Sequence, residues 1–292
     1  MGQAKQKNRI REERQKLSRP MSRARFNVFA IGTRMSPTRY MSEEISFWSD
    51  QEERVLGLVF RDTTDDDYGW ILLARDRLGR FRSVDLAVSL RSPEYATVGL
   101  RQRIAKAVED GDFAALGHQD DETNYATNLL DVPPGTDPER LHPHFRVLLD
   151  EPSRAPARAV FREIGPWLTP SDPHFVSEFQ FKQFDQRLWE VYLWSALREM
   201  GFDITQPEAP DFLCRAPRVE FTVEATTVTA STSGALVNHP DPKTPVEMRA
   251  FLADYMPMKF GSSLKTSSTK RTQPAKATGS VARPPGSHSL SP

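Results

Sequence analysis

The chain has little of several features that would narrow its class. Cys214 is the only cysteine among 292 residues, so a disulfide or a cysteine-based zinc site is not expected within one chain, and a reducing cytoplasm is the expected compartment. No run of about 18 apolar residues occurs, which argues against a transmembrane helix and a membrane partner. The basic N-terminus is not followed by an apolar stretch, unlike a secretory signal.

Net charge is also absent, but the charges are unevenly distributed. Residues 1–25 carry nine Lys/Arg against two acids, and residues 265–292 carry five Lys/Arg and no acid. The body, residues 26–264, carries 25 Lys/Arg against 37 Asp/Glu, a net charge of −12. Basic arms beside an acidic body favour contact with a polyanion such as nucleic acid. Solvated tails without a partner are the alternative interpretation.

Composition predicts five stretches. They are a basic disordered or helical arm (1–25), a small α+β domain (26–130), a proline-rich linker (131–158), a second domain (159–264) and a disordered tail (265–292). In the linker, His142 and His144 are expected at the surface rather than as metal ligands.

The first domain shows strand and helix patterns in turn. Apolar runs at 54–61, 69–74 and 80–88 predict strands of an antiparallel sheet. From residue 92 to 108 the apolar spacing becomes helical, and Ser92-Pro93 is typical of a helix start.

The second domain begins with a strong helical pattern at 179–200. Eight of the ten residues from 188 to 197 are apolar, which predicts burial on most sides. Trp189, Tyr192 and Trp194 are therefore expected in the core rather than on a base-stacking surface. Gly201 is expected to end this helix. Short strands are predicted at 202–205, 211–214 and 219–228, and a further helix at 245–255.

Three carboxylates stand where carboxylates are costly. Glu190 lies inside the apolar helix and needs a partner, either Arg187 or a group across the interior. Asp211 opens a strand after Pro210, and Glu224 is predicted in mid-strand, on the polar face of a largely buried strand. If the strands at 211 and 224 pair as a hairpin under the helix, the three acids converge. Convergent carboxylate oxygens are what Mg²⁺ requires.

The order of these residues resembles the PD-(D/E)xK nuclease superfamily. The matching residues are Glu190 in a helix, Gly201-Phe202, Pro210-Asp211-Phe212, and Glu224 in a Val-rich strand. The stretch 189–228, with Met258 to Leu264 and the opening Met1 to Gln6, also resembles a family of bacterial proteins whose name implies no activity. The first resemblance implies a restriction-endonuclease-like α/β core at 159–264. Because the tail after Leu264 is too polar for a closing strand, this core is expected to be incomplete at its C-terminal end.

What the superfamily resemblance implies is Mg²⁺-dependent phosphodiester hydrolysis of nucleic acid. Glu190, Asp211 and Glu224 then hold the metal. The lysine that the superfamily places two residues after the second acid is Thr226 here, so Lys259 is the candidate to orient the water, with Lys182 as a weaker one. Two rival hypotheses remain. One is non-catalytic nucleic-acid binding on the same fold, which Thr226 favours. The other is a protein-interaction module in which the first domain is the functional part.

Overall fold

The computed structural model describes residues 6, 13–14, 16–34, 36–120, 126–228, 240–261 and 264. Its helices accompany two antiparallel sheets, which confirms the predicted α+β class. The chain divides into two compact units, residues 1–225 and 226–292, and each is described by itself. The division therefore does not fall at the stretch 131–158, where the sequence predicted it.

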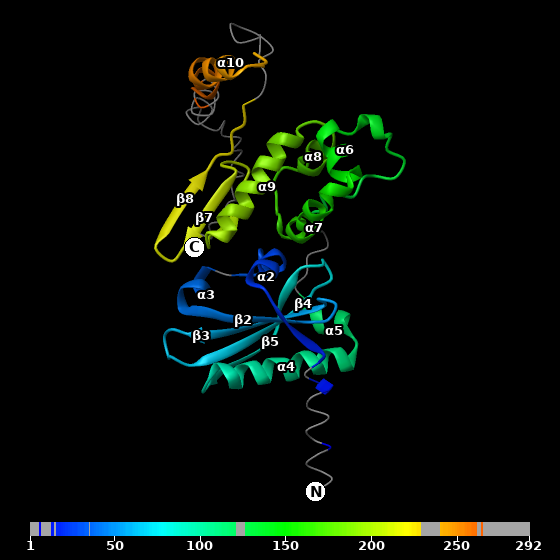
Figure 1. Cartoon of the computed structure of the whole chain (residues 1–292), viewed down its shortest axis with the longest axis vertical. Coiled ribbons are helices and arrows are strands. Elements are labelled where there is room, and N and C mark those ends of the chain that lie inside the picture. The colour runs from blue at the N-terminus through cyan, green and yellow to red at the C-terminus, as the bar shows by residue number, and fades with distance from the viewer. Residues whose placement is uncertain are drawn as a thin grey trace, which may run out of the picture. The chain divides into compact units, whose positions relative to one another are not determined.

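The first sheet is a five-stranded antiparallel meander in which each strand pairs with the next along the chain (Figure 1). Its strands are β1 (Ser18–Met21), β2 (Ser42–Asp50), β3 (Val55–Asp62), β4 (Tyr68–Arg75) and β5 (Phe81–Leu90). The strands predicted at 54–61, 69–74 and 80–88 are confirmed. The sequence did not indicate β1, which carries Pro20. An edge strand tolerates proline, and β1 lies at the sheet edge.

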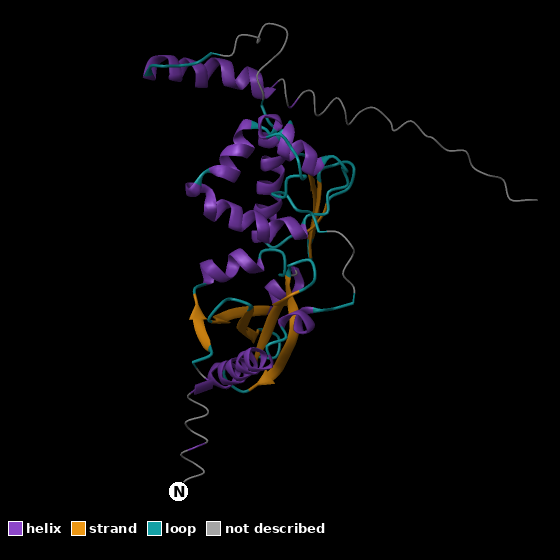
Figure 2. Cartoon of the chain, turned by 90° about the vertical axis from the view of Figure 1, so that its right-hand side faces the viewer, coloured by secondary structure: helices purple, strands orange, loops and turns teal. Residues whose placement is uncertain are grey.

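Helices cover both faces of this sheet, because alternate residues of a strand point to opposite sides. One face packs on α4 (Pro93–Asp110), which runs along the sheet in Figure 2. This cluster includes Val55, Val59, Leu72, Leu100 and Ile104. The other face packs on α2 (Arg23–Ala30). That cluster includes Leu56, Leu73, Phe81, Phe26 and Phe29. Residues 18–25 therefore belong to the folded body rather than to an arm.

α4 begins where the sequence predicted it. The Ser92 hydroxyl accepts a hydrogen bond from the Tyr95 backbone N–H at 3.2 Å, and Pro93 occupies the first turn. Gly111 ends the helix with a φ of 72°, a conformation that costs glycine little. The short helices α3 (Ser36–Met41) and α5 (Phe113–Gly117) flank the sheet elements in sequence.

The proline-rich stretch 131–158 is not an extended linker. It holds the 3₁₀ turns η1 (Pro138–Arg140) and η2 (Pro152–Arg154) and the helix α6 (Pro143–Asp150), and it runs into α7 (Ala155–Ile164) and the turn η3 (Gly165–Trp167). Leu141, Phe145 and Leu148 are buried in the core that these helices share with the second sheet. The prediction was wrong because Pro138, Pro143, Pro152 and Pro156 lie in the first turns of helical segments, where a missing N–H is not needed.

The helix predicted at 179–200 is two helices, α8 (Phe175–Phe181) and α9 (Phe184–Glu199). Lys182 lies in the break between them, so it is not on the same helix as Glu190, as the sequence suggested. Gly201 follows the end of α9 with a φ of 97°, which confirms its predicted role as the helix terminator.

The second sheet is a three-stranded antiparallel meander of β6 (Asp203–Thr205), β7 (Phe212–Ala216) and β8 (Val219–Val223). Its buried side joins α6, α8 and α9 in one core around Phe179, Trp194 and Phe212. In the second unit, α10 (Pro245–Ala250) and the π-helical turn η4 (Phe251–Tyr255) occupy the helix predicted at 245–255. The predicted disordered tail, 265–292, lies outside the described residues.

Arg198 connects α9 to the segment that follows α2. Its guanidinium donates to the backbone oxygens of Gly32 and Arg34 at 2.8 and 2.7 Å, and to that of Phe202 at 3.2 Å. It also forms an ion pair with Asp203 at 3.2 Å. The side chain is largely buried, and burial is the main reason that the pKa of Arg198 is lowered.

We expect Arg198→Met to lower the free energy of unfolding by about 3 kcal/mol, because buried carbonyl groups lose their donor. Urea denaturation of the full chain measures this. The matched control is Arg14→Met, since the Arg14–Glu109 ion pair is exposed and such pairs contribute about 0–1 kcal/mol. Equal losses in the two variants would contradict the role given to Arg198.

Candidate functional site

Asp211 and Glu224 lie at matched ends of two neighbouring strands. Asp211 directly precedes β7 and Glu224 directly follows β8, and the adjacent residues Phe212 and Val223 are paired. The Asp211 carboxylate accepts a hydrogen bond from the backbone N–H of Ala225 at 2.6 Å. The hairpin predicted from the strands at 211 and 224 is therefore present, and Asp211 fastens the chain where β8 ends.

Glu224 differs from its predicted setting in two respects. β8 ends at Val223, so Glu224 is not in mid-strand, and its side chain is exposed rather than on a largely buried strand. The predicted alternation itself is correct, because Phe221, Val223 and Ala225 pack against the core. β8 is a sheet edge among the described strands, which is why its outer face meets solvent.

Glu190 is buried in α9, with 5% of its surface exposed, and its partner is Arg187. One Arg187 nitrogen, Nη1, lies 2.9 and 3.1 Å from the two carboxylate oxygens of Glu190. Desolvation by burial raises the pKa of Glu190, although Arg187 opposes that change. The nearby Asp211 carboxylate raises this pKa further, so α9 brings Glu190 into the electrostatic neighbourhood of Asp211.

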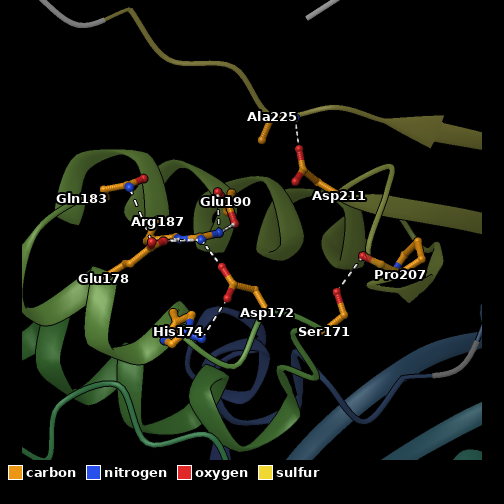
Figure 3. Close-up of polar contacts among 10 residues, drawn as sticks. All are labelled: Ser171, Asp172, His174, Glu178, Gln183, Arg187, Glu190, Pro207, Asp211 and Ala225. Carbon is orange, nitrogen blue, oxygen red and sulfur yellow. Dashed lines mark hydrogen bonds and ion pairs between the residues drawn. The ribbon is translucent and has the colours of Figure 1, made fainter. Parts of the chain in front are cut away.

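Arg187 is shared by three carboxylates, as Figure 3 shows. Besides Glu190, it binds Glu178 of α8, with Nε 2.9 Å from Oε2, and Asp172 in the segment before α8. Its guanidinium also lies over the Phe175 ring, 4.9 Å from the centroid. Burial lowers the pKa of Arg187, but Glu178 and Glu190 outweigh that effect and raise it. The helical acid of the site is therefore neutralised by a fixed cation.

This donor set does not fit a magnesium ion in the conformation described. Across the parts of the chain that the structure describes, no three His, Cys, Asp or Glu side chains gather closely enough to hold a metal. Both oxygens of Glu190 bind Arg187, and one oxygen of Asp211 binds Ala225. Mg²⁺ needs an almost regular octahedron of oxygens, which oxygens turned toward a guanidinium and an amide do not offer.

The residues considered for the lysine role have different settings. Lys182 is exposed at the break between α8 and α9. Thr226 and Lys259 belong to the second unit, where the Lys259 side chain is buried. The role of Lys259 in orienting a water therefore stays a prediction.

The predicted burial of the three aromatic residues is correct only in part. Trp194 is in the core, as predicted, but Trp189 and Tyr192 are 38% and 59% exposed and stack on each other with their ring centroids 5.3 Å apart. The apolar run predicted a helix buried on most sides, whereas α9 exposes these two aromatic residues to solvent. His144 is at the surface and contacts Asp185 at 2.8 Å, an acidic partner that the sequence did not indicate.

Several described arginines near the N-terminus have acidic partners. Arg19 and Arg25 both bind Glu53, at 2.9 and 2.6 Å, and Arg14 binds Glu109 at 2.8 Å. Their charges are partly satisfied within the protein, which reduces what this segment offers to phosphate groups. Lys5, Lys7, Arg9 and Arg11 lie outside the described residues.

Sequence reasoning missed Asp172 and Glu178. Both bind Arg187 through tertiary contacts, 15 and nine positions away in sequence, and no local spacing predicts such partners. The available signal was Arg187 itself, a charged residue one turn from a buried acid. Comparisons with known proteins add no further residues, because no family model, curated protein or solved structure matches the chain. In the described part of the chain, no helix combines the length and the apolar character needed to span a bilayer.

We expect Glu190→Gln to change the pH dependence of stability. Because the pKa of Glu190 is raised by burial, the folded state retains this proton at pH values where the unfolded chain has released it. The stability of the native chain should therefore rise relative to the variant as pH falls through the range just above the ordinary carboxyl pKa. Chemical denaturation between about pH 7 and pH 5 measures the difference. A difference that shrinks on acidification contradicts the assignment, and the exposed Glu199→Gln on α9 is the control.

We expect Arg187→Met to cost about 3–5 kcal/mol of unfolding free energy, because Glu190 then keeps a buried charge without a counter-charge. The double variant Arg187→Met with Glu190→Leu should regain much of that loss, since removing both charges removes the unpaired one. Urea denaturation of the three proteins tests this. A double variant less stable than the single one would show that Glu190 is not the group that Arg187 neutralises.

Proposed function

We propose that the α9–β6–β7–β8 region is a nucleic-acid-binding module of restriction-endonuclease-like type that binds without cleaving. The absence of cleavage is inferred from the ion cluster at Arg187. Its guanidinium neutralises Glu190 and also binds Glu178 and Asp172. A fixed organic cation supplies positive charge but no exchangeable water, whereas hydrolysis assisted by a metal needs an activated water.

The order of helices and strands supports the proposed restriction-endonuclease-like type. A helix carrying Glu190 precedes a three-stranded meander, Pro210-Asp211 stands at the start of its second strand, and Glu224 stands at the end of its third. This is the order on which the resemblance to the superfamily rests. Thr226 in the lysine position also agrees with binding in place of cleavage, since a hydroxyl cannot stabilise negative charge as an ammonium does.

The test is a binding and cleavage assay on the full chain with labelled single-stranded and double-stranded DNA and RNA. We expect binding at low salt that weakens steeply as salt rises, because phosphate contacts release counterions. We expect no product with EDTA, Mg²⁺ or Mn²⁺. Absence of binding at low salt would overturn the proposal and favour a protein-interaction role.

Mg²⁺-dependent phosphodiester hydrolysis is the second candidate function. Two observations favour it. Asp211 is near enough to Glu190 for its charge to raise the pKa of Glu190, and β7, which follows Asp211, pairs with β8, which leads to Glu224. Product that appears only with metal, and that is lost in Asp211→Asn but kept in Glu199→Gln, would replace the first proposal with this one.

A further inference from the structure

A cleft of about 800 Å³ lies at the turn between β7 and β8. It is lined by residues of this turn, of β6 and of the end of α3. They are Arg215, Ala216, Pro217, Arg218, Val219, Asp203, Tyr40 and Met41. Its volume is within the range of clefts that hold small organic ligands, about 300–1,000 Å³. The site described above does not use any of these residues.

The cleft gathers apolar side chains that are exposed to water. Tyr40, Met41 and Val219 are 60%, 51% and 47% exposed. Exposed large apolar groups that share one concave surface are characteristic of binding sites. Tyr40 provides an aromatic ring, against which a flat apolar group stacks favourably.

The charge left over in the cleft is positive. Asp203, its acidic residue, is paired with Arg198 at 3.2 Å, and Arg215 is paired with Glu220 at 2.5 Å. Arg218 is exposed and makes no hydrogen bond or ion pair with any residue that the structure describes. An unpaired guanidinium offers a planar fork of donors that matches a phosphate group.

The hairpin places this cation away from the carboxylates. Ala216 pairs with Val219, so Pro217 and Arg218 form the turn, and Phe212 pairs with Val223 at the other end, beside Asp211 and Glu224. At a strand rise of about 3.3 Å per residue, the two ends are roughly 13 Å apart. This exceeds the Debye length of about 8–10 Å at ordinary ionic strength, so the acids repel a phosphate at the turn only weakly.

We propose that this cleft binds one nucleotide of a single-stranded nucleic acid. The base stacks on Tyr40 and packs against Met41 and Val219, and Arg218 binds the phosphate. Aromatic stacking combined with a cationic group is the usual chemistry of single-strand binding. A single strand is required because a duplex keeps the faces of its bases stacked on one another. The proposal rests on the function proposed above and names the subsite that carries it.

The experiment measures fluorescence anisotropy of a labelled oligothymidylate of about 20 nucleotides, longer than the site of about 4–16 nucleotides that one single-strand-binding domain covers. The full chain is used in EDTA, so that cleavage plays no part. We expect Tyr40→Ala to weaken binding about tenfold, and Tyr40→Phe to bind as the native chain does. We expect Arg218→Gln to weaken binding several-fold and to lower the salt slope by about one phosphate contact.

Two controls match the substituted side chains. Tyr192 is 59% exposed on α9, so Tyr192→Ala removes an equally exposed tyrosine outside the cleft. Arg140 is an exposed arginine that, like Arg218, has no side-chain partner among the described residues. We expect both control variants, Tyr192→Ala and Arg140→Gln, to bind as the native chain does. Thermal melting checks that each variant is folded.

The outcomes separate this inference from the proposed function. If Tyr40→Ala and Arg218→Gln bind nucleic acid as the native chain does, the cleft is not the binding subsite. The proposed binding function then remains. Loss of affinity in Tyr192→Ala alone overturns the cleft in favour of the stacked pair on α9. No binding of any nucleic acid overturns both. Cleavage in the presence of metal, with binding still weakened by the cleft variants, overturns only the non-catalytic part of the proposed function.

Discussion

The buried ion cluster at Arg187 is the interaction on which the second half of the first unit depends. A carboxylate as buried as Glu190 is tolerated only with a counter-charge, and Arg187 supplies it from one turn earlier on the same helix. By also binding Glu178 and Asp172, the same guanidinium fixes α8 and the segment before it against α9 across the break at Lys182. The position of α9 in turn sets where the β6–β8 sheet packs.

α9 also connects this cluster to the rest of the unit. Its inner side, through Val191, Trp194 and Leu197, joins the core shared with the second sheet. At its C-terminal end, Arg198 binds the backbone after α2, and Arg39 donates to the backbone oxygen of Glu199 at 2.6 Å. These contacts connect α3 and the segment after α2 to α9, and Tyr40 of α3 lines the same cleft as Arg218 of the β7–β8 turn.

Local patterns predicted the fold where the chain obeys local rules. The strands β3 to β5, the start of α4 at Ser92, the stop at Gly201 and the pairing of β7 with β8 all follow from periodicity, capping and glycine. The predictions that failed depend on tertiary contacts. Prolines in 131–158 begin helical turns whose apolar residues reach a distant core, and composition alone does not show this. Likewise, two of the three carboxylates that bind Arg187, Asp172 and Glu178, come from outside its helix, so no local spacing indicates them.

The ion cluster at Arg187 affects where an anion can bind. A divalent ion among carboxylates attracts phosphate to the site itself, but Arg187 is largely buried and its charge is already shared by three acids. Together with Asp211, these acids leave that region with negative charge in excess, so phosphate is repelled there. The positive charge that remains available on this hairpin is Arg218, at the opposite end of β7 and β8. For the proposed binding of nucleic acid, electrostatics therefore favours the turn of the hairpin over its acidic end, and Tyr40 lines the cleft at that turn.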